Sequence, residues 1–162
     1  MAHHLTVSIR APVEMVFAFF DEPATTLESS PHAERFEVTG TSPDGCRTYD
    51  VWMGAGERRW MQTVEQVLRE PPKRLVTRGW SWTDDRSKRM LTISTDRRFS
   101  ADGNATRVDV VVDAQLEQPL RHPLQAVTNW LRGGATQREF EHQLLLVAKR
   151  VGALNGLATD AG

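Results

Sequence analysis

Tryptophan is the residue type that sets this sequence apart, because it occurs five times in 162 residues. Its large apolar ring is typical of pockets that bind apolar small molecules, where a few polar groups fix the ligand's orientation. Four tryptophans lie in segments with strand patterning, where Trp80 and Trp82 share one strand face, and the fifth, Trp130, lies in a helical segment. The alternative is that the tryptophans belong to the core or cover the outside of a sheet.

We expect an apolar ligand site built from tryptophans, from apolar strand and helix residues, and from three polar groups. The candidate ligand-binding residues are Tyr49, Trp52, Trp60, Gln62, Arg78, Trp80, Trp82, Val110, Val112, Trp130, Phe140 and Leu144. Which strand faces line the site stays open, because a single β-bulge inverts the alternation of side chains.

Other chemistries lack their residue patterns. The five histidines have no metal-ligand spacing, and the pair Glu139 and His142 has no second copy, so we expect no metal. The glycines around Ala55 lack the third glycine of a nucleotide-binding loop, and no G-x-S-x-G motif is present. Cys46 has no neighbouring histidine and is expected to be a small strand residue. The sequence therefore identifies no catalytic residue and no cofactor.

Charge and hydropathy exclude several classes of partner. The net charge of −1 gives no basic excess for nucleic acid. The longest apolar run, Met15–Phe20, is far shorter than the ~20 residues that span a bilayer. A single cysteine and no signal-peptide pattern favour a soluble cytoplasmic protein. Residues 69–98 hold nine basic and four acidic side chains, which form either a face for an anionic partner or the solvated outside of strands.

Residue periodicity predicts the elements of an α+β fold. Leu5, Val7 and Ile9 alternate with polar residues, as in a half-buried strand. Pro12 and Glu14 favour a helix start directly after it, and a second short helix is expected at 23–30. Strands separated by turn sequences are then expected at 35–39, 47–53, 58–69, 74–82, 90–100 and 106–117.

From Pro123 the apolar period becomes that of a long helix. Its apolar face is expected to hold Trp130, Phe140, Leu144, Val147, Val151 and Leu154. Gly133 and Gly134 predict a kink. We expect one domain over residues 1–154 and a disordered tail over 155–162.

Three local motifs occur within this order of elements. The first is the strand-to-helix sequence Val7–Phe17, with Ala11-Pro12-Val13-Glu14 at its centre. The second is Trp60–Val64, followed by the turn Pro71-Pro72-Lys73-Arg74-Leu75, and the third is the strand beginning Thr106-Arg107-Val108. Together they make the chain resemble the START-like superfamily, also called the polyketide cyclase/dehydrase and lipid-transport (SRPBCC) superfamily, over about residues 5–154.

The resemblance implies a helix-grip fold. In this fold a curved antiparallel sheet of about six or seven strands wraps around a long C-terminal helix, with two short helices after the first strand. The resemblance also implies a cavity between sheet and helix, but the superfamily has no shared catalytic motif to transfer onto these residues.

Three functions stay open. The first is non-catalytic binding of a small hydrophobic molecule (a lipid, a polyketide or an aromatic compound) by a carrier or sensor. The second is a polyketide cyclase or aromatase, which needs a paired acid and base such as Asp50 or Tyr49 with Arg78 or Arg59. The third is a protein-interaction module that uses the basic hairpins. The oligomeric state is also open, with a homodimer as one alternative, and no stable membrane insertion is expected.

Overall fold

The structure, a computed structural model, describes residues 2–28, 30, 32–83, 85–116 and 135–160. The order of the elements agrees with the periodicities of the sequence. The elements are β1 (Ala2–Ile9), α1 (Val13–Asp21), α2 (Pro23–Glu28), β2 (Ala33–Thr41), β3 (Arg47–Ala55), β4 (Arg58–Glu70), β5 (Arg74–Thr83), β6 (Arg89–Asp102), β7 (Ala105–Leu116) and α4 (Ala135–Asp160).

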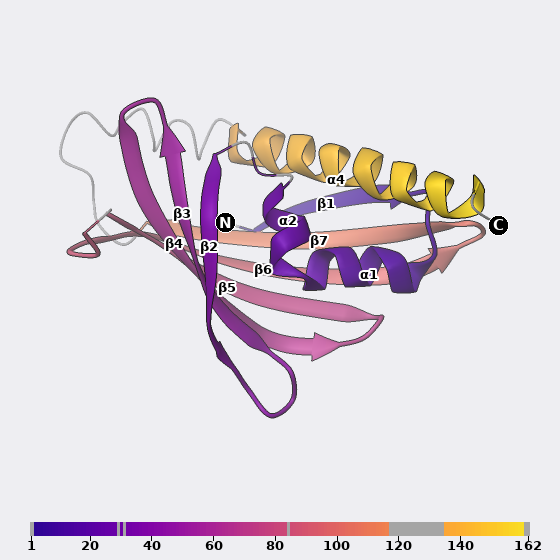
Figure 1. Ribbon diagram of the computed structural model, residues 1–162, viewed down its shortest axis with the longest axis horizontal. Coiled ribbons are helices and arrows are strands. Elements are labelled where there is room, and N and C mark those ends of the chain that lie inside the picture. Colours follow the sequence, from indigo (N-terminus) through magenta and orange to yellow (C-terminus); the bar gives the residue numbers. More distant parts are fainter. Residues whose placement is uncertain (1, 29, 31, 84, 117–134, 161–162) are drawn as a thin grey trace.

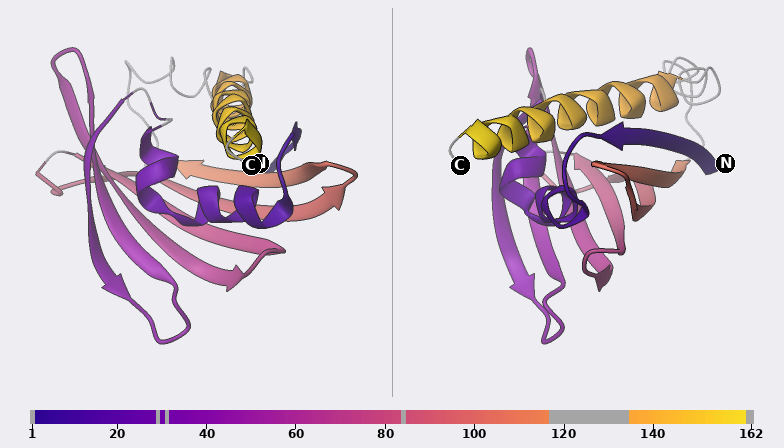
Figure 2. Two further views of the ribbon diagram at one scale, coloured as in Figure 1. Left: turned by 45° about the vertical axis from the view of Figure 1, so that its right-hand side comes forward. Right: turned by 90° about the vertical axis from the view of Figure 1, so that its right-hand side faces the viewer.

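The seven strands form one antiparallel sheet in the order β1-β7-β6-β5-β4-β3-β2. The sheet curves, and α1, α2 and α4 lie on its concave side (Figures 1 and 2). The predicted helix-grip fold is therefore confirmed. We call the face toward α1 and α4 the inner face and the opposite one the outer face.

Helix α1 begins where the sequence predicted. Pro12 is the residue directly before the helix, with φ −59°, the value that its ring imposes. Glu14 in the first turn suits the positive end of the helix dipole. Its buried side carries Phe17 and Phe20, whose ring centroids lie 5.3 and 5.6 Å from that of Phe99 in β6. These contacts fix α1 against the inner face of the sheet.

The main core lies between the inner face of β1, β6 and β7 and the helices α1 and α4. From α4 it includes Leu144, Val147 and Val151. Burying one such side chain contributes about 1.5–3 kcal/mol. Helix α4 is therefore packed stably against this half of the inner face. The other buried members are Leu5, Ile9, Ala11, Val16, Phe17, Phe19, Phe20, Leu75, Phe99, Val108, Val110 and Val112.

A β-bulge in β4 places two polar side chains on the inner face. The pairing of β4 with β5 shifts between Gln66 and Leu68. Side chains two residues apart share a face in a regular strand, but an extra residue reverses the alternation. Gln66 and Arg69 therefore both point inward, where each donates a hydrogen bond to Asp21 at the end of α1.

The C-terminal helix is longer than its predicted end. A disordered tail was expected from Asn155, but α4 continues through Asp160, and the Asn155 side-chain amide donates a 3.2 Å hydrogen bond to the carbonyl oxygen of Arg10. The expected helix start at Pro123 and the kink at Gly133 and Gly134 lie outside the described residues. Within the described ranges, no helix combines the length and the hydropathy needed to cross a membrane.

Candidate ligand-binding site

The inner face of β2, β3 and β4 carries a second apolar cluster, separate from the main core. Tyr49, Val51 and Met53 of β3 are its buried members, and Trp60 and Val64 of β4 pack against them half-buried. The register confirms that they share a face, because Tyr49 pairs with Val64 and Met53 with Trp60. This cluster forms the apolar part of the candidate site.

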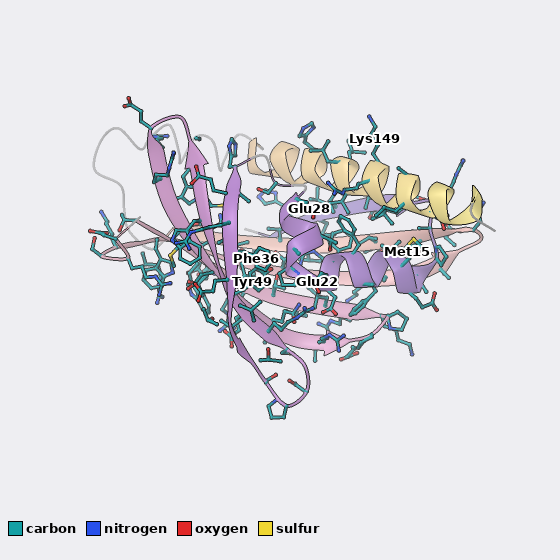
Figure 3. All side chains as sticks on the ribbon, viewed as in Figure 1. Met15, Glu22, Glu28, Phe36, Tyr49 and Lys149 are labelled. Atoms are coloured by element: carbon teal, nitrogen blue, oxygen red, sulfur yellow. The ribbon has the colours of Figure 1, made fainter. Side chains whose placement is uncertain are left out.

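The neighbouring strand β2 carries two apolar side chains beside the second cluster that stay partly exposed to solvent. Phe36 pairs with Val51, and Val38 pairs with Tyr49, so both lie on the inner face. They keep 39% and 43% of their surface exposed. Figure 3 marks Phe36 and Tyr49 on these adjacent strands. Exposed aromatic and aliphatic side chains on the side that also holds the helices offer apolar surface to a small molecule.

The structure divides the predicted site residues between the two faces. Strand register and core contacts place Tyr49, Trp60, Gln62, Val110, Val112 and Leu144 on the inner side. Val110, Val112 and Leu144 belong to the main core, whereas Tyr49, Trp60 and Gln62 belong to the region of the second cluster. Phe140 lies on α4, but its side chain, like all of Trp130, lies outside what the structure describes.

The other candidates, Trp52, Arg78, Trp80 and Trp82, lie on the outer face. Arginine guanidinium groups cover the outer tryptophans. The Arg35 group lies 3.7 Å from the ring centroid of Trp52, and the Arg89 group lies 4.9 Å from that of Trp82. Cation–π contacts of this kind contribute about 0.5–1 kcal/mol at exposed sites. These rings therefore have contacts of their own, away from the inner cluster.

The outer face also holds a buried carboxylate, Asp50. It accepts a 2.8 Å hydrogen bond from Thr63 and pairs with Arg86, while the indole N–H of Trp82 donates to the Thr63 hydroxyl at 3.2 Å. The residues considered for an acid–base pair therefore lie on different faces of the sheet. Asp50 and Arg78 lie on the outer face, and Tyr49 lies on the inner face. Arg59, at the start of β4, pairs with Glu34 at 3.4 Å.

Between the two apolar clusters the inner face is polar. Gln66 and Thr77 pair across β4 and β5, and Thr77 pairs with Thr95 of β6. Next to Thr95 along the same face stands Arg97, whose Nη1 donates a 3.3 Å hydrogen bond to the Thr77 hydroxyl. Its guanidinium also lies 5.6 Å from the ring centroid of Phe20. Arg97 is not among the site residues predicted from the sequence, although it occupies the inward position of β6 two residues before Phe99.

Burial changes the acidity of two of these groups. It raises the pKa of Tyr49, an effect that the charge of Arg97 opposes. The Tyr49 hydroxyl is therefore neutral at physiological pH and can donate a hydrogen bond. Burial has the opposite effect on Arg97 and lowers the pKa of its guanidinium. An arginine nevertheless stays protonated in proteins. The inner face thus presents a neutral donor and a cationic donor.

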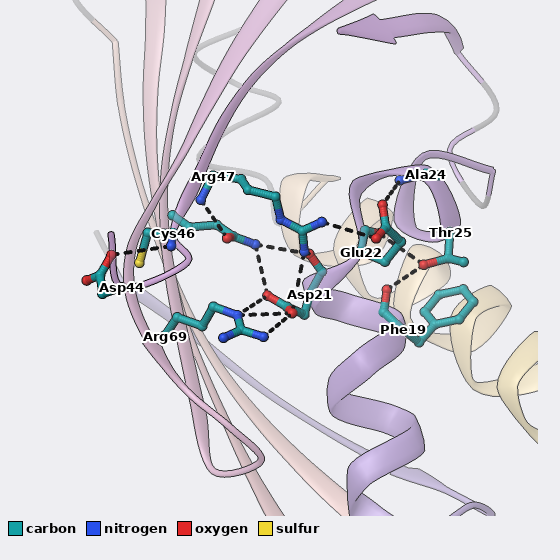
Figure 4. A network of polar contacts seen from close by, with 10 residues as sticks. Phe19, Asp21, Glu22, Ala24, Thr25, Asp44, Cys46, Arg47 and Arg69 are labelled. Atoms are coloured by element: carbon teal, nitrogen blue, oxygen red, sulfur yellow. Dashed lines mark hydrogen bonds and ion pairs between the residues drawn. The ribbon is translucent and has the colours of Figure 1, made fainter. Parts of the chain in front are cut away.

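A dense polar network joins α1 to the sheet beside this site (Figure 4). Asp21, only 7% exposed, accepts hydrogen bonds from Nε and Nη2 of Arg69 at 2.9 Å each and from Gln66 Nε2 at 3.2 Å. Arg47 donates to the Asp21 carbonyl oxygen at 2.6 Å and to Glu22 at 3.1 Å. Two arginines here face two carboxylates, so their charges cancel.

Cys46 lies beside an open depression of about 430 Å³ at the β2–β3 end of the sheet, lined by Ser42, Asp44, Gln66 and others. Burial raises the pKa of the Cys46 thiol, and the nearby Asp44 carboxylate adds to the effect. A raised pKa disfavours the thiolate, which is the nucleophilic form.

Comparison with known proteins supplies the class of the fold. No family model matches the sequence, and no curated protein matches it closely. Among solved structures, a START superfamily protein from Mycobacterium smegmatis aligns with a TM-score of 0.70 and 14% identity, over 94% of this chain and 98% of that one. The chain therefore has the START-like fold that its sequence resembles.

Two further structures illustrate the range of proteins that share this fold. The ZhuI aromatase/cyclase from Streptomyces sp. R1128 aligns with a TM-score of 0.72 and 14% identity, over 93% of each chain. A conserved protein from Geobacillus kaustophilus aligns with a TM-score of 0.73 and 11% identity, over 94% of this chain and 96% of that one. Identities this low establish the fold alone.

Proposed function

We propose that this protein binds a small hydrophobic molecule on the inner face of β2, β3 and β4, as a carrier or sensor without catalysis. The observation that carries the proposal is the second apolar cluster. Phe36 and Val38 of β2, which lie beside this cluster, stay partly exposed although they are on the helix side of the sheet. Binding would remove this apolar surface from water, which is the main driving force for apolar ligands.

The distribution of titratable groups favours binding over catalysis. A cyclase needs an acid and a base close to one reacting atom. Asp50 and Arg78 lie on the face away from the cluster, and Asp21 is held by Arg69 and Gln66. The ZhuI aromatase/cyclase shares the fold, but no acid–base pair of this chain's described residues supports the same activity here.

The position of Trp60 makes the proposal testable. We expect the intrinsic fluorescence to change when the protein is titrated with fatty acids, fatty alcohols, quinones or polycyclic aromatics. Trp60 lies on the inner face and Trp52 on the outer face, so the two are matched probes. The ligand-induced change should be mostly lost in Trp60→Phe and kept in Trp52→Phe.

Phe36→Ser should weaken binding of the same ligand. The exposed 39% of a phenylalanine corresponds to about 80 Å². At about 25 cal/mol per Å² this is at most about 2 kcal/mol, or about 30-fold in affinity. Val67→Ser is the control, since Val67 is also an exposed apolar residue but lies on the bulge of β4. If no apolar ligand binds, or if Trp52→Phe alone removes the signal, the proposal is wrong.

A further inference from the structure

Arg97 stands on the inner face where the polar residues Thr77 and Thr95 meet the main core. In the sheet register its neighbours are Leu75 of β5 and Val110 of β7, both buried in the main core. The Phe20 ring of α1 lies against its guanidinium. The residue as a whole remains half-buried, so part of its surface is still accessible. A side chain that is surrounded by core residues and still accessible is suited to line a binding site.

Among the described residues, Arg97 also lacks a carboxylate partner of the kind that accompanies the inward arginines Arg47 and Arg69. Within the described residues its only hydrogen bond is the one to Thr77, and its buried Nε has no partner. Arg69, by contrast, forms a two-pronged pair with Asp21. A partly buried charge without a counter-ion is unfavourable, and so is a buried donor without an acceptor.

A second unused donor belongs to Tyr49. No hydrogen bond joins its hydroxyl to any part of the chain that the structure describes. Tyr49 and Arg97 both lie on the inner face of the sheet, and the arginine charge acts to lower the tyrosine pKa. Both groups donate, and neither can serve as the other's counter-ion while the tyrosine is neutral. Since no described residue supplies an acceptor for these two donors, a bound ligand is the acceptor that we consider.

We propose that Arg97, assisted by the Tyr49 hydroxyl, binds the carboxylate of an apolar acid whose hydrocarbon part lies on the second apolar cluster. The inference rests on the proposed function and names its ligand class. The charges support a monoanion. Arg47 and Arg69 are matched by Asp21 and Glu22, whereas no carboxylate among the described residues pairs with the single charge of Arg97. A phosphomonoester, which carries more than one negative charge, would leave part of its charge unpaired.

The test compares each acid with a neutral partner of the same shape. Octanoic and dodecanoic acids are paired with the corresponding alcohols, and naphthoic acid is paired with its methyl ester. Affinities are measured by calorimetry near pH 8, where the acids are ionised. A hydrogen bond to a charged group is worth about 10- to 100-fold in affinity. We expect at least one acid to bind more tightly than its neutral partner by that factor.

Two variants assign the preference to one arginine. Arg97→Met replaces the charge with an unbranched apolar side chain and should reduce the affinity for the acid toward that of its neutral partner. Arg98→Met is the matched control, because Arg98 is the next residue, points outward and lies 3.5 Å from Asp96. It should keep the preference. Tyr49→Phe should reduce the preference without abolishing it.

The outcomes separate the two proposals. If acids and neutral partners bind the wild type equally, the assignment of Arg97 is overturned while the binding proposal stands. The same holds if Arg97→Met retains the preference. If no member of any pair binds, both proposals are overturned.

Thermal unfolding of Arg97→Met gives a second measurement that needs no ligand. Arg97→Met should unfold no lower than the wild type, because it removes an uncompensated charge, and a clear loss of stability would indicate a structural role instead.

Discussion

Replacing Asp21 by asparagine should test the link between α1 and the sheet. The carboxylate accepts two hydrogen bonds from Arg69 and one from Gln66, and it lies 3.4 Å from Arg47. An asparagine side chain has nearly the same shape, but its amide N–H groups would face the donors of Arg69. The variant therefore removes the charge and leaves arginine donors without an acceptor.

The magnitude follows from the burial of the pair. Removing one partner of a buried ion pair costs about 3–5 kcal/mol. Arg69 retains 29% of its side-chain surface, so water can replace part of the lost contact. We expect Asp21→Asn to lower the free energy of unfolding by about 2–3 kcal/mol, below that range because of this exposure. Urea unfolding followed by tryptophan fluorescence measures this directly.

The control is an exposed pair on another strand. Asp109 bonds Arg107 at 3.0 Å, but both side chains are largely exposed, and such pairs contribute little. Asp109→Asn should therefore change stability much less than Asp21→Asn. If the two variants lose the same free energy, the Asp21 network does not hold α1 on the sheet, and the argument from burial is refuted.

Two further predictions concern pH and backbone conformation. The Arg74 hydrogen bonds lower the pKa of Asp96 in the folded state, so the pair's stabilisation is full above the ordinary aspartate pKa of about 3.9 and is lost as the pH falls below it. Urea unfolding at about pH 6 and about pH 3 should show a smaller acid loss for Asp96→Asn than for the wild type; an equal loss would contradict this sign. Gly103→Ala should cost about 1 kcal/mol because its φ is +60°, whereas Gly152→Ala in α4, where nothing lies within 4 Å, should stabilise by about as much. Thermal unfolding of both variants should give shifts of opposite sign.

The sequence predicted the elements well because their apolar periods are strong. The alternation from Val108 to Val112 marks β7, and Pro12 marks the start of α1. The shared face of Trp80 and Trp82 also followed from their two-residue spacing, which the regular pairing of β5 with β4 confirms. Periodicity, however, shows which residues share a face and not which face the helices cover. That choice depends on tertiary packing, so the tryptophans could not be sorted into inner and outer from the chain alone.

The two charged residues that matter most to the proposals were also the hardest to find. Arg97 and Arg98 are adjacent in a basic region, and composition alone does not distinguish them. In the sheet, Arg97 points inward and Arg98 points outward. The signal was available in the strand pattern, since Ile93, Arg97 and Phe99 occupy the same alternate positions of β6. The contacts of Asp21 were harder to predict. Its partners Gln66 and Arg69 share a face only because of a bulge that no sequence pattern indicated.

The pairing of β1 with β7 determines how this chain can be assembled during synthesis. Leu5 pairs with Val110 in the sheet, so β1 finds its partner strand only after β7, the last strand of this sheet in sequence order, has been made. Until then the hairpins from β2 to β7 can form from near neighbours, while β1 remains an unpaired apolar strand. Contacts between such distant segments slow folding, because a long loop must close before any contact is gained. We therefore expect β1 to join the sheet last, after β7 has been made.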